Sequence, residues 1–324
     1  MVCVTAIITI FTITCVSALS AFSINRGVAN TSKTGLAWPN GDSVDLGQYR
    51  TTGKVSWYYT WSPFSIDTDL EFVAMLWGQK SVDQFSSTIN DTIAKRGVKA
   101  ILGMNEPQEP GQSNLTAEQG AEMWKAYLEP LRSQGIRLGS PAPSSAPSGK
   151  IWLQDFLVAC AGACTVDFIA LHYYDVNATQ FKEYLTDYHQ TFQRPLWVTE
   201  WACQNFNDLQ AQCSKDDVVL FLNETQIFMD NSDFVERYAW FGAMRDMSGV
   251  NQADALMDSG GKINALGKQY IGSEPPQTSG GGNADGPMAP GGRDGGVSIS
   301  SSSSKWIGFR ATNAILLFFA FLLI

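Results

Sequence analysis

Two glutamates stand at the ends of short apolar runs in separate parts of the chain. One run ends in Asn105-Glu106, and a later one ends in Glu200. Carboxyl groups brought together can serve as a general acid and a nucleophile. Each glutamate alone has an ordinary explanation, since Glu106 could solvate a helix start and Glu200 could form an ion pair. The interpretation therefore depends on whether the fold brings both groups to one place.

Eight short apolar runs divide the chain and are the candidate strands that would position these carboxylates. Several are almost continuously apolar, which is typical of strands buried on both faces of a parallel sheet. They are residues 34–38, 55–61, 71–77, 99–105, 136–142, 166–174, 195–201 and 235–242.

Amphipathic segments separate most of these runs and predict helices. Capping-box patterns begin at Thr116 and Ser214, with helices expected to end near Gln134 and Asp230. Further helices are expected over 80–96, 149–162, 177–192 and 261–270. Strand–helix alternation repeated eight times favours an α/β fold of the (β/α)8 TIM-barrel class. The gap 62–70 is too short for a full crossover helix, so we expect a short or irregular second βα unit.

Catalytic groups of such barrels lie at the carboxyl ends of the strands, so the residues there are candidate site residues. Glu106 ends the fourth run and Glu200 the seventh. Between and around them we expect a collar of aromatic and hydrogen-bonding groups: Trp38, Trp61, Trp77, Asn105, His172, Tyr174, Trp201 and Trp240. Tryptophans at strand ends are more often core residues, and a single histidine is more often structural. Paired carboxyls with flat apolar rings nonetheless suit polysaccharide chemistry, in which rings stack on sugar faces.

The motifs LAWPNG, SWYYTW, GMNEP, LHYY and VTEWAC resemble those of glycoside hydrolase family 128, a group of clan A retaining hydrolases that includes fungal endo-β-1,3-glucanases. The resemblance covers about residues 33–272. It implies Glu106 as acid/base, Glu200 as nucleophile and Asn105 as donor to the 2-hydroxyl of the reacting sugar. It also implies that either Tyr174 or His172 lies near the nucleophile, and the sequence leaves that choice open.

The expected activity is therefore retaining hydrolysis of β-1,3-glucan, with endo action, during degradation or remodelling of cell walls. Retention requires carboxyl groups about 5–5.5 Å apart, and the acid requires a raised pKa. One alternative is a β-glucan-binding wall protein with little turnover. The other is a related clan A hydrolase acting on β-1,4-glucan or mannan.

Four cysteines follow the first twenty residues, and two local disulfides are expected among them. Cys160 and Cys164 precede one apolar strand, whereas Cys203 and Cys213 follow another. In a parallel sheet the two pairs would then lie at opposite ends of strands about 20 Å long, beyond disulfide reach. The pairs Cys160–Cys164 and Cys203–Cys213 are predicted, with free buried thiols as the alternative.

Both ends of the chain carry targeting patterns. Residues 1–21 are read as a secretory signal peptide. The folded domain is expected over 22–275, and a Gly/Ser/Pro-rich tether over 276–303. Residues 304–324 end in an apolar tail of the kind that a glycolipid anchor replaces. We therefore expect a secreted glycoprotein at the cell surface or wall, attached to the membrane through the anchor.

The composition limits the partners. The net charge is −9 and basic residues form no cluster, which argues against nucleic acid binding. His172 and His189 are the two histidines, and cysteine and histidine do not recur at ligand spacing, so no metal or other cofactor is expected. The expected partner is a β-glucan polysaccharide or oligosaccharide bound by a monomer. Sequons predict surface glycans at Asn30, Asn90, Asn114, Asn177 and Asn223.

Overall fold

The computed structural model describes residues 32–279. The expected signal peptide, the anchor signal and nearly all of the tether lie outside these residues. Within them, no helix combines the length and apolar character needed to cross a membrane.

Every strand pairing within the two sheets is parallel. One sheet has the order β3-β2-β1-β9-β8-β7 and the other the order β4-β5-β6. The strands are β1 (Thr34–Ala37), β2 (Trp57–Tyr59), β3 (Glu71–Phe72), β4 (Ala74–Met75), β5 (Ala100–Leu102), β6 (Arg137–Gly139), β7 (Ile169–Asp175), β8 (Leu196–Cys203) and β9 (Val235–Trp240).

The two sheets meet at two joints. At the first, only Val73 separates β3 from β4, so the third expected strand is a single interrupted one. At the second, a bridge between Gly139 and Phe168 connects β6 to the residue before β7. A Cβ on Gly139 would lie 2.3 Å from the Phe168 ring, so only glycine permits this approach. The strands therefore follow one another in a TIM-barrel-like order, which confirms the expected fold class, although the hydrogen-bonded ladder is interrupted.

Helices follow most strands, as the sequence predicts. They are α1 (Val82–Arg96), α2 (Ala117–Met123), α3 (Pro147–Ala159), α4 (Ala178–Phe192), α5 (Lys215–Asn231) and α6 (Ala265–Tyr270). Thr116 and Ser214 form the expected capping boxes at the starts of α2 and α5. The helix that starts with α2 continues as a π-helical turn and a 3-10 turn to Gln134. Residues 60–70 contain no helix, which confirms the irregular second unit.

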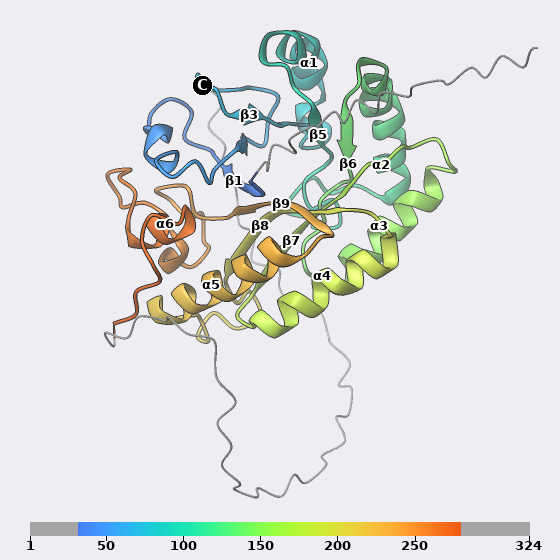
Figure 1. Cartoon of the computed structure of the whole chain (residues 1–324). Helices are drawn as coiled ribbons and strands as arrows, with labels where there is room; N and C mark the ends of the chain where they lie inside the picture. Colours follow the sequence, from blue (N-terminus) through green and yellow to red (C-terminus); the bar gives the residue numbers. More distant parts are fainter. Residues whose placement is uncertain (1–31, 280–324) are drawn as a thin grey trace, which may run out of the picture. The chain divides into compact units, whose positions relative to one another are not determined.

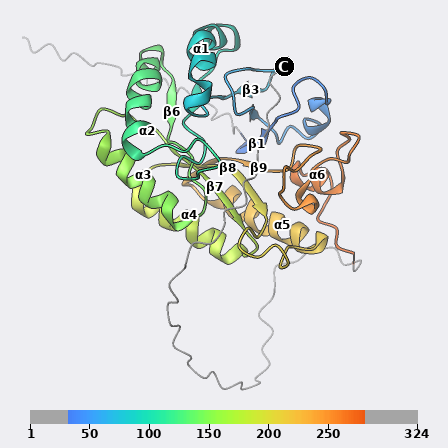
Figure 2. The same cartoon turned by 180° about the vertical axis from the view of Figure 1, so that it is seen from behind.

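The helices α4 and α5 lie side by side along the outer side of β7 and β8 (Figures 1 and 2). Helix α4 packs on β7 and β8, and α5 packs on β8 and β9. Their buried side chains follow helical spacing; in α4 these are Phe181, Leu185, Tyr188 and Phe192. This packing fixes β7 and β8, the two strands that carry His172, Tyr174 and Glu200.

The structure contains both expected disulfides. Cys160 and Cys164 join the end of α3 to the turn that follows, with Cα atoms 5.4 Å apart. Cys203 and Cys213 close the loop between β8 and α5, with Cα atoms 5.9 Å apart. The second bridge therefore closes a loop that directly follows the end of β8, and its first cysteine lies three residues after Glu200.

Candidate active site

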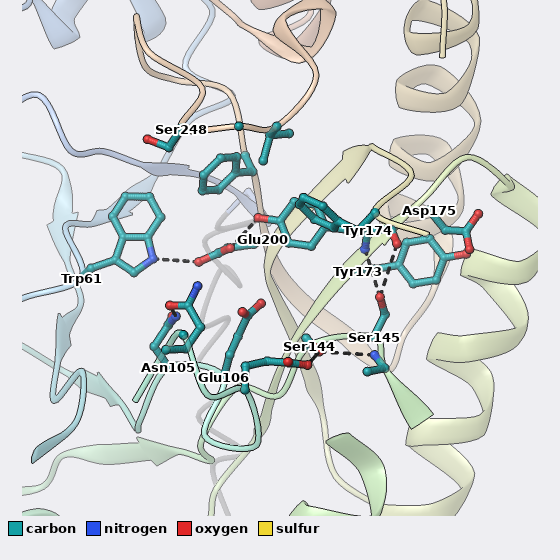
Figure 3. Close-up of a pocket in the computed structure, with 18 of the residues that line it drawn as sticks. Trp61, Asn105, Glu106, Ser144, Ser145, Tyr173, Tyr174, Asp175, Glu200 and Ser248 are labelled. Atoms are coloured by element: carbon teal, nitrogen blue, oxygen red, sulfur yellow. Dashed lines mark hydrogen bonds between the residues drawn. The ribbon is translucent and has the colours of Figure 1, made fainter. Parts of the chain in front are cut away.

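A cleft of about 1410 Å³ opens at the carboxyl ends of the strands. Glu106 and Glu200 both line it, and Figure 3 shows the Glu106 carboxylate directed toward Glu200. Of the expected sugar-contacting residues, the cleft is lined by Trp61, Trp77, Asn105 and Tyr174. The fold therefore brings together two carboxylates that lie far apart in sequence, together with aromatic and amide groups.

The backbone is strained where two of these residues leave their strands. Glu106 has φ 37° and Trp61 has φ 54°, both in the left-handed region that non-glycine residues rarely adopt. The Glu106 amide nevertheless donates to the Ala142 carbonyl at 2.8 Å, which fixes this conformation against the neighbouring strand end. Strain of this kind costs about 1–3 kcal/mol per residue and concentrates at functional sites.

Glu106 is buried and bonded to a histidine. Its Oε1 atom lies 2.8 Å from Nδ1 of His172. Burial raises the pKa of Glu106 above its ordinary value. The hydrogen bond and charge of His172 oppose the rise, whereas the charges of Glu200 and Glu109 support it. Glu106 thus has the raised pKa that a carboxylic acid needs to keep a proton for catalysis.

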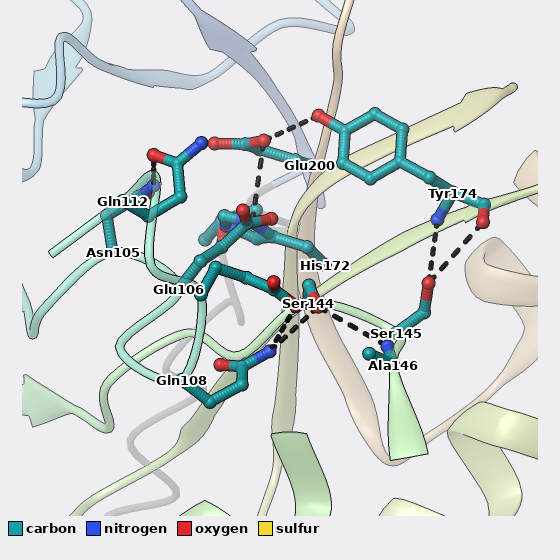
Figure 4. Close-up of polar contacts among 12 residues, drawn as sticks. Asn105, Glu106, Gln108, Gln112, Ser144, Ser145, Ala146, His172, Tyr174 and Glu200 are labelled. Atoms are coloured by element: carbon teal, nitrogen blue, oxygen red, sulfur yellow. Dashed lines mark hydrogen bonds and ion pairs between the residues drawn. The ribbon is translucent and has the colours of Figure 1, made fainter. Parts of the chain in front are cut away.

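Glu200 receives hydrogen bonds on both oxygens. The Trp61 indole donates to Oε1 at 2.7 Å, and the Tyr174 hydroxyl donates to Oε2 at 2.5 Å. The Tyr59 hydroxyl lies 3.5 Å from Oε1 and donates to the Thr199 carbonyl at 2.9 Å. Burial, followed by the charge of Glu200, raises the pKa of Tyr174 well above its usual range. The phenol therefore stays protonated as a donor, and the carboxylate is held in one orientation (Figure 4).

His172 and Tyr174 both contact the nucleophile candidate, because they are two residues apart on one face of β7. Nδ1 of His172 lies 3.4 Å from Oε2 of Glu200, farther than the Tyr174 hydroxyl. His172 is 1% exposed and does not line the cleft. The expectation that His172 contacts substrate is therefore wrong: the ring lies behind the carboxylates. Burial would lower the pKa of His172, but the charge of Glu200 and the hydrogen bond of Glu106 raise it.

Glu106, His172 and Glu200 place one oxygen or nitrogen each within 4.8 Å of one another. In residues 32–279 this is the one group of three acidic, histidine or cysteine side chains close enough to hold a metal ion. Yet His172 is bonded directly to Glu106, and Glu200 accepts from neutral donors. We interpret the group as a hydrogen-bonded acid–base set.

Three expected sugar platforms belong to the core. Trp38, Trp201 and Trp240 are each 0% exposed and do not line the cleft. Their indole N–H groups donate to Gly41 O, Thr225 Oγ1 and Asp254 O respectively. A ring enclosed on all sides cannot stack on a sugar, so these assignments are corrected. Trp201 and Trp240 instead pack edge to face, 5.0 Å apart between centroids.

Asn105 lines the cleft, and only one of its two side-chain amide atoms has a hydrogen-bond partner among the described residues. Its Nδ2 donates to Oε1 of Gln112 at 3.1 Å, whereas its buried Oδ1 has no hydrogen-bond partner among the described residues. An unsatisfied buried oxygen is costly unless a ligand completes it. Trp77 is half-buried beside it, and its carbonyl accepts from the Asn105 amide at 2.9 Å.

Several cleft residues were missed because they lie on loops without a periodic signal. Phe241 follows β9 and packs on Trp61 and Tyr174, with centroids 6.0 and 5.8 Å away. Phe206 and Leu209, on the loop closed by the Cys203–Cys213 bridge, are 45% and 51% exposed at the cleft. Because successive side chains of a strand point to opposite faces, the position of Phe241 next to Trp240 could have indicated that one of the two faces the cleft.

Comparison with known proteins agrees with this geometry. Residues 35–270 match the family described as glycosyl hydrolase catalytic core. A family 128 subgroup III protein of Blastomyces gilchristii is 31% identical, with a TM-score of 0.61, and the match covers 74% of this chain and 97% of that one. The chain belongs to glycoside hydrolase family 128. That relative is described as a curdlan-specific exo-β-1,3-glucanase and was solved with glucose.

Two further relatives extend the comparison. A subgroup I endo-β-1,3-glucanase of Amycolatopsis mediterranei, solved with laminaritriose, is 27% identical with a TM-score of 0.62, covering 75% of this chain and 100% of that one. Alkali-sensitive linkage protein 1 of Schizosaccharomyces pombe is 32% identical over 247 residues, which are 74% of this chain. The chain spans 44% of that relative's length. This protein is thus a glycoside hydrolase by family.

Proposed function

We propose that the protein is a retaining hydrolase of β-1,3-glucan, with Glu106 as acid/base and Glu200 as nucleophile. The observation that carries the proposal is the short separation of the two carboxylates, which have oxygens within 4.8 Å of each other. Retaining enzymes hold their carboxyl groups about 5–5.5 Å apart, whereas inverting enzymes leave about 6.5–9.5 Å for a water molecule. The cleft fits the first geometry.

In the first step Glu200 attacks the anomeric carbon while Glu106 donates its proton to the leaving oxygen. Trp61 and Tyr174 hold both oxygens of Glu200, so the attacking oxygen is oriented before substrate arrives. Burial raises the pKa of Glu106, which favours the protonated form that the first step requires. The products of this step are a glycosyl ester on Glu200 and a free leaving sugar.

In the second step the ionised Glu106 removes a proton from water, which attacks the ester and restores Glu200. His172 lies against Glu106 throughout and stabilises its charged form by a hydrogen bond. Asn105, with its partnerless Oδ1 held at the cleft, binds a hydroxyl of the reacting sugar in this proposal. Each role falls on a residue already fixed by the fold.

The proposed substrate is a β-1,3-linked glucan chain. Both family 128 relatives described above are β-1,3-glucanases, one exo-acting and one endo-acting. We propose endo action because the cleft, at about 1410 Å³, exceeds the usual 300–1,000 Å³ of a small-molecule pocket. Half-exposed Phe206 and Leu209 extend its apolar lining beyond the carboxylates.

Reducing-end release from laminarin, cellulose and mannan tests the activity and the linkage together. Wild type should act on laminarin in preference to the other two, and Glu106→Gln and Glu200→Gln should each lose turnover. A wild-type enzyme that binds laminarin without releasing reducing ends would instead favour a glucan-binding protein. Activity greatest on cellulose or mannan would move the substrate class to β-1,4-linked chains.

We also propose that the protein works outside the cell, at the surface or wall, attached by a glycolipid anchor and acting as a monomer. The support is the pair of targeting patterns, which lie outside the described residues. Asn90, Asn114 and Asn177 are exposed and Asn223 is half-buried, which supports glycosylation at these sequons. Release of the protein from cells by a phosphoinositide-specific phospholipase tests the anchor.

A further inference from the structure

A third carboxylate, Glu109, lines the cleft but has no part in the two-step mechanism. The Glu109 amide donates to the Glu106 carbonyl at 2.9 Å, so one tight turn carries both glutamates. Its side chain is half-buried rather than fully solvated.

Neighbouring side chains hold Glu109 in one orientation. Its Oε1 accepts from Ser144 Oγ at 2.7 Å and from Gln108 Nε2 at 3.3 Å. Gln108 Nε2 also donates to Ser144 Oγ at 2.7 Å (Figure 4). The three side chains therefore form a closed triangle of hydrogen bonds.

The second oxygen of Glu109 is left for a ligand. Oε2 receives no hydrogen bond from residues 32–279, and no lysine, arginine or histidine of that range forms an ion pair with this carboxylate. A carboxylate oxygen is a strong acceptor for a sugar hydroxyl. Glu109 therefore presents one fixed and one available oxygen at the cleft.

The position of Glu109 indicates which sugar it would meet. Glu106 protonates the oxygen that departs with the leaving sugar, whereas Glu200 bonds to the sugar that stays. Glu109 lies on the Glu106 turn and shares no hydrogen-bond partner with Glu200, whose donors are Trp61 and Tyr174. Its negative charge also helps to raise the pKa of Glu106.

We propose that Glu109 binds a hydroxyl group of the leaving sugar and so selects for carbohydrate, rather than other, leaving groups. The inference rests on the proposed hydrolysis of β-1,3-glucan. Ser144 and Gln108 act as positioning residues that fix the carboxylate. The same contact would hold an acceptor sugar on the glycosyl-enzyme, which favours transfer over hydrolysis when sugar is abundant.

Two substrates that differ only on the leaving side test this role. Laminaritetraose has a sugar leaving group, whereas 4-nitrophenyl β-laminaribioside has an aromatic one without sugar hydroxyls. We would measure kcat/KM for wild type, Glu109→Gln and Glu109→Ala, with Glu122→Gln on the exposed side of α2 as the matched control. Each value is taken on the plateau of that variant's pH profile, so that a shifted pKa of Glu106 does not contribute.

Glu109→Ala should lower kcat/KM for laminaritetraose about tenfold or more, the usual effect of losing a bond to a charged acceptor. The value for the nitrophenyl substrate should change little, Glu109→Gln should be intermediate, and Glu122→Gln should match wild type. Equal losses on both substrates, or no loss on laminaritetraose, would overturn the role of Glu109. A wild type that cleaves neither substrate would instead refute the proposed function and this inference with it.

Discussion

The Nδ1 atom of His172 lies 2.8 Å from Oε1 of Glu106, and the imidazole is almost completely buried. Substrate in the cleft meets Glu106 but not His172, because His172 does not line the cleft. Burial is the largest influence on the pKa of Glu106, and His172, a group behind the cleft, modifies it. Hydrogen bonding and charge from His172 lower the pKa of Glu106, against the larger effect of burial.

Replacing His172 should therefore change the pH profile. In His172→Gln the positive charge is lost, so the pKa of Glu106 should rise and the basic limb of kcat/KM should move to higher pH, by about one unit. His189→Gln is the matched control, since His189 stacks on Phe234 and lies outside the cleft. A basic limb that stays in place or moves to lower pH would contradict the assigned role of His172.

Tyr174→Phe should reduce turnover while leaving the fold intact. The phenol donates to Glu200 at 2.5 Å, and hydrogen bonds to charged groups are worth about 1.5–3 kcal/mol. We expect kcat/KM for laminari-oligosaccharides to fall about tenfold or more. Tyr127→Phe is the control, because Tyr127 is half-buried and does not line the cleft. Equal activity of the two variants would argue against orientation of Glu200 by Tyr174.

Phe206→Ala should weaken the use of long substrates more than short ones. The ring is 45% exposed at the cleft and packs edge to face on Tyr174, 5.4 Å between centroids. Loss of one aromatic contact should lower kcat/KM by at most about tenfold, with the largest effect on laminarin. Phe64→Ala removes a ring of similar exposure, 44%, that does not line the cleft. A decrease that is independent of chain length would contradict a sugar platform at Phe206.

Asp254 should make stability depend on pH. Burial raises the pKa of this carboxyl to about 8, although the Cys203 amide donates to it and opposes the rise. The unfolded value is about 3.9. The folded state therefore binds more protons between about pH 4 and 8, and stability should fall by up to about 1.4 kcal/mol per pH unit as pH rises through that window.

In Asp254→Asn the amide oxygen can still accept from Cys203, but the titration is gone. Chemical denaturation at several pH values should give a flatter stability curve for this variant than for wild type. Asp155→Asn, at an exposed position on α3, should retain the wild-type curve. Parallel curves for wild type and Asp254→Asn would contradict the raised pKa.

Strand patterning predicted the barrel because nearly continuous apolar runs leave few alternatives to buried parallel strands. It also predicted that Glu106 and Glu200 meet, since parallel strands place their carboxyl ends at one mouth. The local disulfides followed from the same geometry. The interruption between β3 and β4 had no signal in the sequence, because Val73 is as apolar as its neighbours.

The aromatic residues around the cleft were predicted less well, because the prediction ignored the alternation of side chains between the two faces of a strand. Successive side chains of a strand point to opposite faces, so Trp201 cannot share the face of Glu200. Trp240 likewise points into the core, whereas the next residue, Phe241, faces the cleft. The register between β7 and β8 shifts between Leu171 and His172, and no pattern in the sequence predicted this shift. Loop residues such as Phe206 and Glu109 could not be placed at the cleft from the sequence, because loops have no periodic pattern.

The stereochemistry of the first product tests the central claim, that Glu106 and Glu200 form a retaining pair acting on β-1,3-glucan. Proton NMR of wild type acting on laminaritetraose would follow the anomeric signals before mutarotation. The carboxylate separation predicts that the β-anomer appears first and the α-anomer only later. Initial release of the α-anomer would contradict the account.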